Sequence, residues 1–138
     1  MSIKVEDYFD RDTFKKMKAL ADQKETPFVV IDLPTISRAY DQLGSCFPFA
    51  KTYYAVKANP AVEIIDLLKE KGSNFDIASI YELDKVLAQG VGPERISYGN
   101  TIKKARDVRY FYEKGVRLFA TDSRSEERRV GKECRSRW

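Results

Sequence analysis

Tyr53-Tyr54-Ala55-Val56-Lys57-Ala58-Asn59-Pro60 is the stretch of sequence that decides the fold. Its first four residues are aromatic or apolar, which predicts a short strand, and Asn59 and Pro60 both favour the start of a helix. Lys57 therefore lies where a predicted strand gives way to a helix. An amine that is partly removed from water loses its preference for the charged form and becomes a nucleophile. The alternative is a strand-end lysine whose ammonium simply reaches solvent.

The same alternation of strand and helix recurs along the chain, at intervals of roughly 21–25 residues. The segments between the apolar runs have apolar residues at helical spacing, and Gly72 and Gly90 stand where helices are expected to end. This alternation predicts an α/β fold with a parallel sheet, either doubly wound or a (β/α)8 TIM barrel. No Gly-x-Gly-x-x-Gly turn follows a strand, which weakens the dinucleotide-binding alternative. The predicted strands are 28–31, 53–56, 75–78, 96–98 and 116–120.

The first 25 residues form a separate predicted segment. They are rich in charge and carry apolar residues at helical spacing, which predicts an N-terminal helix. Asp12 and Thr13 are the residues that we expect to cap it.

The last fifteen residues, 124–138, break the alternation. Val130, Cys134 and Trp138 are their only apolar residues, and the string matches the translation of a sequencing adapter. We therefore expect a non-native tail and exclude it from the predicted fold, which leaves 26–123 as the α/β domain. The alternative is a genuine basic tail that binds nucleic acid or an acidic surface.

Composition narrows the classes of function. The chain has 25 basic and 21 acidic residues, for a net charge of +4. Six of the basic and three of the acidic residues lie in 124–138, so residues 1–123 carry only +1 and offer no basic patch for nucleic acid. Cys46 is the only cysteine before the tail, which fits a reducing compartment such as the cytoplasm. The sequence has no histidine, no apolar run long enough to span a bilayer and no signal-peptide core, so we expect neither a histidine metal site nor a membrane partner.

The motif around Lys57 resembles the lysine signature of the pyridoxal-phosphate-dependent decarboxylases of basic amino acids, whose barrel is of the alanine racemase type. Further resembling segments are 26–32, 75–79, 96–100 and 119–123. Among the members of the family, they most resemble bacterial ornithine decarboxylases. In the family the matching lysine holds pyridoxal 5'-phosphate as a Schiff base, and the substrate amino acid then loses CO2.

The resemblance implies the N-terminal half of a (β/α)8 barrel, truncated before the family's C-terminal β domain. Half a barrel leaves two open strand edges, so we expect the chain to be unstable or to aggregate by itself. Family active sites form between two subunits, which implies a homodimer for the full-length parent. Other cofactor-binding groups of the family lie beyond residue 123, so we expect the fragment itself to be inactive.

Polar residues follow the predicted strands at their carboxyl ends, where barrel active sites lie. The resemblance places the residue that matches Asp76 close to the cofactor and to Lys57, which predicts an ion pair between the two. The alternative for Asp76 is a structural carboxylate bound to backbone N–H groups. Asp122 occupies a similar position after the last strand, and we assign it no role.

Three further residues have both a site role and a structural role open to them. The resemblance places Glu82 near the cofactor and the turn of Asn100 at the border of the site, and Ser79 lies at the end of the strand that carries Asp76. Ser79-x-x-Glu82 is also a helix capping box, and Asn100 is a plausible N-cap. The predicted cofactor-binding set is therefore Lys57, Asp76, Ser79, Glu82 and Asn100, with Lys57 catalytic. The basic residues Lys103, Lys104 and Arg106 are expected to form a solvated helix face.

The predicted function of the parent is decarboxylation of a basic amino acid, first of all L-ornithine to putrescine in polyamine biosynthesis. The alternatives are a lysine or dual lysine/ornithine decarboxylase, a non-catalytic decarboxylase-like protein that binds a regulatory partner, and a single-domain cofactor carrier with the same barrel. The residues that would measure the length of the substrate side chain are not expected in this part of the barrel.

Overall fold

The computed structural model describes residues 9–135, which divide into two compact units at Asp32–Leu33. The first unit contains helix α1 (Arg11–Ala21). Asp10 caps this helix, because its carboxylate accepts hydrogen bonds from the backbone N–H groups of Asp12 and Thr13 at 3.0 and 2.8 Å. The prediction that Asp12 or Thr13 is the cap is therefore wrong by two or three residues.

Residues 28–31, which end the first unit, do not form the predicted strand. All four of their apolar side chains are exposed, and Val29 retains 85 % of its accessible surface. A strand requires a hydrogen-bonded neighbour, and the described sheet provides none for this segment. Apolar composition alone therefore led to a wrong prediction here.

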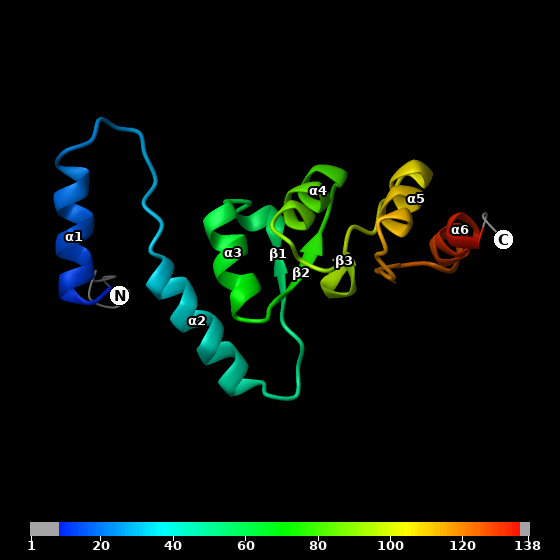
Figure 1. The fold of residues 1–138 in the computed structure, drawn as a ribbon, viewed down its shortest axis with the longest axis horizontal. Coiled ribbons are helices and arrows are strands. Elements are labelled where there is room, and N and C mark those ends of the chain that lie inside the picture. The colour runs from blue at the N-terminus through cyan, green and yellow to red at the C-terminus, as the bar shows by residue number, and fades with distance from the viewer. Residues whose placement is uncertain (1–8, 136–138) are drawn as a thin grey trace. The chain divides into compact units, whose positions relative to one another are not determined.

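The second unit is an alternation of strands and helices around a four-stranded parallel sheet in the order β1-β2-β3-β4 (Figure 1). The strands are β1 (Tyr53–Ala55), β2 (Asn74–Ile77), β3 (Ile96–Tyr98) and β4 (Leu118–Phe119). The helices are α2 (Leu33–Cys46), α3 (Val62–Glu70), α4 (Ile80–Ala88), α5 (Ala105–Glu113) and α6 (Arg124–Arg135), with short 3-10 turns η2 (Val56–Ala58) and η3 (Pro93–Arg95). Four of the five predicted strands are present, and the predicted α/β fold with part of a (β/α)8 barrel is confirmed.

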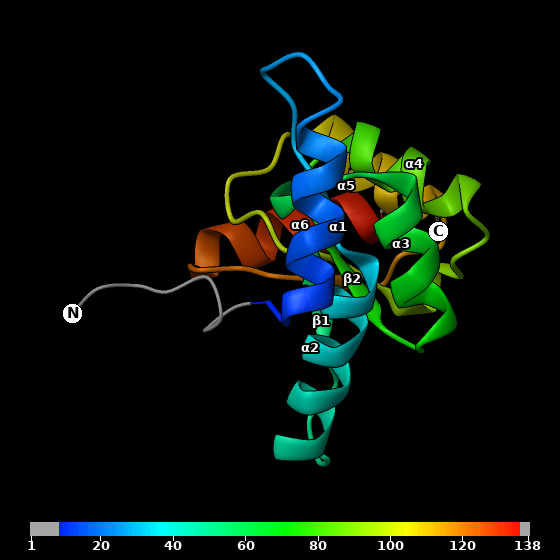
Figure 2. The same ribbon diagram turned by 90° about the vertical axis from the view of Figure 1, so that its left-hand side faces the viewer.

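The two faces of the sheet have different compositions. Phe75 and Ile77 of β2 are fully buried in the same apolar cluster as Leu68 of α3 and Leu83 of α4. Figure 2 shows α3 and α4 on the same side of strands β1 and β2. Because side chains alternate along a strand, Asp76 lies on the opposite face of β2. We call that second face the polar face because Asn74, Asp76 and Ser97 lie on it, together with Tyr53, Ala55 and Leu118.

Helices α3 and α4 end at the predicted glycines. Gly72 and Gly90 have φ angles of +83° and +76°, in the left-handed region that glycine adopts without strain. At β3 the rings of Tyr98 and of Phe111 of α5 stack at a centroid distance of 3.9 Å. None of the helices among residues 9–135 has the length and apolar character needed to cross a bilayer.

Residues 124–135, which the sequence led us to exclude from the fold, form helix α6 alongside α5. Val130 is buried in the core, and Arg109 of α5 makes an ion pair with Glu133 at 2.8 Å. The remaining residues of the predicted tail, 136–138, lie outside the described part. The exclusion of the whole tail from the fold is therefore wrong for its helical part.

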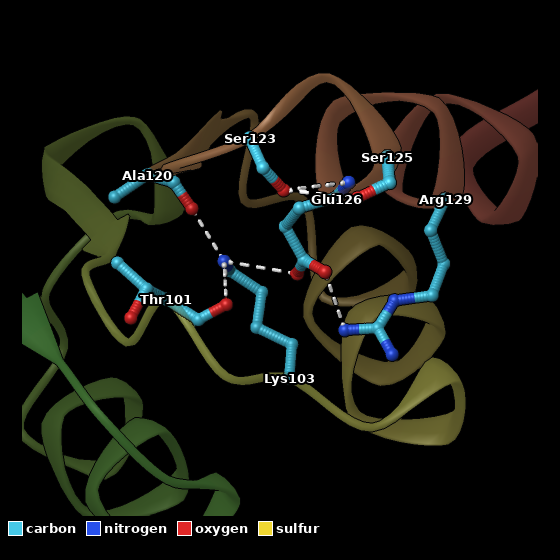
Figure 3. Close-up of polar contacts among 7 residues, drawn as sticks. All are labelled: Thr101, Lys103, Ala120, Ser123, Ser125, Glu126 and Arg129. Carbon is cyan, nitrogen blue, oxygen red and sulfur yellow. Dashed lines mark hydrogen bonds and ion pairs between the residues drawn. The ribbon is translucent and has the colours of Figure 1, made fainter.

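Lys103 is the most unexpected side chain of the fold, because it is only 2 % exposed. Its ammonium donates to the carbonyl oxygens of Thr101, at 3.4 Å, and Ala120, and it pairs with Glu126 of α6 at 3.4 Å (Figure 3). Arg129 binds the other oxygen of the Glu126 carboxylate at 2.6 Å. The prediction that Lys103 belongs to a solvated helix face is wrong. Its ammonium is buried and these partners replace the water that it has lost, so the residue has a structural role.

Candidate active site

Lys57 stands just beyond the carboxyl end of β1, in the 3-10 turn η2. Val56 beside it is fully buried, and the hydroxyl of Tyr54 donates to the carbonyl oxygen of Asn59 at 3.0 Å. The side chain of Asn59 in turn accepts the backbone N–H of Ala61 at 3.1 Å. The turn that carries Lys57 is therefore anchored on both sides.

The amine of Lys57 is exposed and makes no hydrogen bond or ion pair within the described residues. The predicted desolvation of this lysine by its neighbours is therefore wrong for this structure. Its exposure agrees with the alternative of a strand-end lysine that reaches solvent, and it leaves the side chain accessible to a carbonyl carbon at the carboxyl edge of the sheet.

Asp76 lies in β2, half-buried on the polar face of the sheet. Its carboxylate accepts a hydrogen bond from the hydroxyl of Ser97 at 2.6 Å. The predicted ion pair with Lys57 is wrong, and so is the alternative of backbone N–H donors at the next helix, because within the described residues Ser97 supplies the hydrogen bond instead. Strand β3 thus provides the group that satisfies this carboxylate.

Ser79 and Glu82 cap the start of α4 in a variant of the capping box, in which the carboxylate binds the residue before the N-cap. The Ser79 hydroxyl accepts the N–H of Glu82 at 3.3 Å, and the Glu82 carboxylate accepts the N–H of Ala78 at 2.7 Å. The structural role that the sequence left open is therefore confirmed for this pair. A cofactor-binding role for either residue stays a prediction.

Asn100 follows β3 and is exposed. It does not cap α5, whose N-cap position is taken by Lys104, so that structural alternative is wrong. Asn100 and Ser79 line a common pocket of about 370 Å³, whereas Lys57, Asp76 and Glu82 do not contribute to it. The pocket is lined by Ala78, Ser79, Ile80, Tyr81, Tyr98, Asn100, Ile102, Lys104, Arg106 and Asp107.

Two residues that the sequence analysis did not single out complete the surroundings of Asp76. They are Ser97, described above, and Gly99, on which the carboxylate lies so closely that a Cβ atom there would be 2.0 Å from its Oδ1. The pairing of Ser97 with Asp76 could have been predicted from the sequence. The pairing runs Ala55–Asp76 and Asp76–Ser97, each partner 21 residues further along the chain, so the strand repeat itself gives the register.

Comparison with known proteins places these features in a family. Residues 33–137 match the family described as pyridoxal-dependent decarboxylase, pyridoxal binding domain. The chain belongs to this family. The chain is 39 % identical to the chloroplastic ornithine decarboxylase of Nicotiana glauca over 113 residues, which are 82 % of this chain and 26 % of that protein. It is also 34 % identical to antizyme inhibitor 2 of Xenopus laevis over 105 residues, which are 76 % of this chain and 23 % of that protein.

Solved structures agree with the sequence comparison. The lysine decarboxylase of Selenomonas ruminantium superposes with a TM-score of 0.79 at 36 % identity, over 86 % of this chain and 32 % of that one. A further structure of the same decarboxylase is a complex with pyridoxal phosphate and cadaverine. The chain thus spans about a quarter of the length of the curated relatives and about a third of the solved one.

The cofactor of this domain is pyridoxal phosphate, and the donor set of the site fits it. The cofactor's reactive group is an aldehyde, and Lys57 offers an unpaired primary amine. Asp76 adds a carboxylate whose Oδ2 accepts no hydrogen bond from the described residues. The amine matches the aldehyde of the cofactor, and a carboxylate can offset the positive charge of its protonated ring.

Proposed function

We propose that this chain is the part of a decarboxylase of basic amino acids that carries the cofactor-binding lysine. We propose L-ornithine as the preferred substrate and putrescine as the product. The observation that carries the proposal is the unpaired amine of Lys57 on an anchored turn at the carboxyl edge of the sheet. Bound pyridoxal phosphate withdraws electrons from the α carbon of an amino acid, so that CO2 can leave. Lys57 would hold the cofactor through its aldehyde carbon.

The other predicted site residues would act around this attachment. Asp76 would place a fixed negative charge on the polar face of the sheet, close to the turn of Lys57. Ser79 and Glu82 would border the site from the first turn of α4, and Asn100 from the end of β3. All five roles are open to test by substitution.

The choice of ornithine rests on the names of the relatives. Several are ornithine decarboxylases, and the one from Selenomonas ruminantium is described as a lysine/ornithine decarboxylase. A lysine or dual preference is therefore the main alternative for the substrate, and polyamine synthesis is the corresponding cellular role. We further propose a cytoplasmic homodimer with shared active sites for the whole protein. The 138-residue chain spans about a quarter of its relatives, so we expect it to release no CO2 by itself.

A non-catalytic role is the second candidate, and the similarity to antizyme inhibitor 2 favours it. Such a protein would use the same barrel surface to bind a regulatory partner. The presence of Lys57 with its free amine speaks for catalysis, because a binding protein has no use for a nucleophile at this edge. Binding of pyridoxal phosphate at Lys57 therefore separates the two candidates.

The experiment that tests the proposal is chemical trapping of the cofactor. The chain is incubated with pyridoxal phosphate, reduced with borohydride and digested, and the modified lysines are identified by mass spectrometry. We expect modification at Lys57 in preference to the other lysines, its loss in Lys57→Ala, and its retention in Lys104→Ala, which removes another exposed lysine. Equal labelling of all exposed lysines would refute the assignment. Release of labelled CO2 from ornithine, lysine or arginine by the whole protein then identifies the substrate.

We also propose that residues 124–138 are foreign to the natural protein, and that the protein is bacterial. The adapter-like sequence of this segment supports the first idea. The family match to residue 137 and the burial of Val130 favour the opposite view, in which α6 is a native helix. Long-read sequencing of the source DNA across Ser123–Arg124 tests the proposal, since the same fifteen codons in the genome would overturn it.

A further inference from the structure

We propose that Ser97 is a positioning residue that, together with Gly99, fixes the carboxylate of Asp76 for the cofactor. The inference rests on the proposed function, because it assigns the carboxylate to the site of Lys57. It differs from the pairing that the sequence suggested, in which Lys57 itself would neutralise Asp76.

The first step is the hydrogen bond between strands β2 and β3. Ser97 and Asp76 are register partners, and the Ser97 hydroxyl lies 2.6 Å from Oδ1 of Asp76. This is the range of charge-assisted O–H···O⁻ bonds, which are about twice as strong as neutral ones. Ser97 is 8 % exposed, so water competes little for its hydroxyl. One oxygen of the carboxylate is therefore held by a nearly buried donor.

The second step is the space above Gly99. A Cβ atom at this position would lie 2.0 Å from Oδ1 and 2.4 Å from Oδ2 of Asp76, so the carboxylate occupies the place of a side chain. The φ angle of Gly99 is not positive, and its N–H donates to the carbonyl of Ile77 at 3.0 Å, as in a continued strand. The backbone conformation would thus accept any residue, and it is the packing of Asp76 that requires glycine here.

The third step concerns the two groups of the site that this arrangement leaves without a partner among the described residues. The hydrogen bond and the close packing hold Asp76 in one orientation, while Oδ2 and the amine of Lys57 have no partner among the described residues. Asp76 is the register partner of Ala55, two residues before Lys57, so both groups lie at the same edge of the sheet. An ion pair between them would occupy the amine and the carboxylate together. Because Ser97 satisfies the carboxylate, both groups stay available for the cofactor.

The test with cofactor compares four variants of the 138-residue chain. Affinity for pyridoxal phosphate is measured from its visible absorbance and from borohydride trapping at Lys57. We expect Ser97→Ala and Asp76→Ala each to weaken binding about tenfold, the loss of one hydrogen bond to a charged group. Ser97→Thr, which keeps the hydroxyl, should restore binding. Ser73→Ala is the matched control, since Ser73 is a fully buried serine whose hydroxyl, among residues 9–135, binds only the carbonyl of Asn74, at 2.8 Å.

The test without cofactor is a double-mutant cycle on the packing. Gly99→Ala should lower Tm by several degrees in the wild-type chain and by much less in the Asp76→Ala background, where the carboxylate is gone. An equal loss of Tm in both backgrounds would show that the Asp76 carboxylate does not occupy the space above Gly99, and would overturn the inference.

The outcomes separate the two proposals. If the wild-type chain traps no pyridoxal phosphate at Lys57, the proposed function is wrong and the positioning role falls with it. If the wild-type chain traps the cofactor and Ser97→Ala binds it as well as Ser73→Ala does, the function stands and the positioning role is wrong. A lower Tm in Ser97→Ala with unchanged cofactor affinity would also overturn it, since that result indicates a purely structural serine.

Discussion

A buried ammonium is costly unless its partners replace the water it has lost. The Lys103 side chain is fully buried, and its partners come from three segments: the loop after β3 at Thr101, the end of β4 at Ala120 and helix α6 at Glu126. The ring of Tyr98 lies below the ammonium at 5.5 Å from its centroid, and burial raises the pKa of this tyrosine to about 12, with Asp107 and Glu126 adding to the effect. A single side chain therefore joins the last two strands of the sheet to the last helix.

Replacing Lys103 by methionine should destabilise the chain strongly. The substitution keeps most of the volume but removes the ammonium that binds one oxygen of the Glu126 carboxylate and two carbonyl oxygens. Removing one partner of a buried ion pair costs about 3–5 kcal/mol, and we expect a loss near the lower limit because Arg129 still binds Glu126. The free energy of unfolding from urea denaturation measures it.

The matched control for this substitution is Lys104→Met, at the exposed neighbour in the chain. It removes the same charge and should change the free energy of unfolding by less than about 0.5 kcal/mol. Equal stability of the two variants would mean that the buried contacts of Lys103 contribute nothing net. In the double variant Lys103→Met/Glu126→Gln the loss should be smaller than in Lys103→Met, because the buried carboxylate is gone and the guanidinium of Arg129, which loses its partner, is 41 % exposed to water.

At the scale of single elements, the start of α4 combines a helix cap with a predicted cofactor contact. Glu82→Ala should lower the free energy of unfolding by about 1 kcal/mol, because the N–H of Ala78 loses its acceptor. Glu82→Gln keeps an oxygen that accepts this hydrogen bond and should leave Tm nearly unchanged. Thermal unfolding of both variants checks the cap.

The same pair of variants separates the two roles of Glu82. If the residue only caps the helix, Glu82→Gln should bind pyridoxal phosphate as the wild-type chain does. Weaker binding in Glu82→Gln at unchanged Tm would instead show that the negative charge acts on the cofactor. A fall in Tm for Glu82→Gln as large as for Glu82→Ala would contradict the cap as described.

The ends of α4 and α5 provide a comparison between two glycines in the left-handed region. Gly90 has φ +76° and open space around it, so Gly90→Ala should lower the free energy of unfolding by about 1 kcal/mol, from backbone strain alone. Gly115 has φ +96°, and a Cβ there would lie 2.9 Å from Cγ of Pro93. Gly115→Ala should therefore cost about twice as much, since steric overlap adds to the strain.

Chemical denaturation of the two glycine variants side by side measures this difference. The two positions end helices of equal length, so helix propensity does not distinguish them. A loss for Gly115→Ala no larger than that for Gly90→Ala would show that Pro93 moves aside at no cost.

At the scale of the whole molecule, the repeat of strand and helix was the part of the fold that sequence predicts best. Parallel strands joined by helices require similar lengths of chain, so apolar runs at a regular interval predict their order. The same logic located Lys57 at the carboxyl edge, because the end of a strand is visible in the sequence. The packing of one chain segment against a distant one is not visible in the sequence. For that reason residues 28–31 were predicted as a strand, whereas in the structure they are exposed and form no strand.

The partners of the charged side chains were predicted wrongly from the sequence. Asp76 was expected to pair with the nearest cation of the motif, whereas the register of β2 and β3 gives it Ser97. Lys103 was expected to be solvated, because its carboxylate partner Glu126 lies in the segment that composition led us to exclude. In both cases the decisive contact joins residues more than twenty positions apart, across elements whose mutual placement follows only from the folded structure.

The contact of α6 with the rest of the second unit should depend on pH through Glu126. Burial raises the pKa of this carboxyl group, but the hydrogen bond and charge of Arg129, with those of Lys103, outweigh it, so that its pKa lies below the ordinary value of 4.5. A carboxyl group whose pKa is lower in the folded chain stabilises that state fully above the unfolded pKa, and the contribution is lost as pH falls through the folded pKa. We therefore expect Tm to be unaffected by this group above pH 4.5 and to fall below it.

Hydrogen exchange locates the effect and Glu126→Gln identifies its source. In the wild-type chain the amide protection of α6 should decrease on acidification below pH 4.5, ahead of the protection of α3 and α4, whose contacts involve apolar residues such as Leu68 and Leu83. In Glu126→Gln the amide protection of α6 should already be low at neutral pH. It should not decrease further on acidification, because residue 126 no longer carries a carboxyl group. An acid step of the same size in both chains would mean that another carboxyl group controls the docking of α6, and that the ion pair with Lys103 does not hold the helix in place.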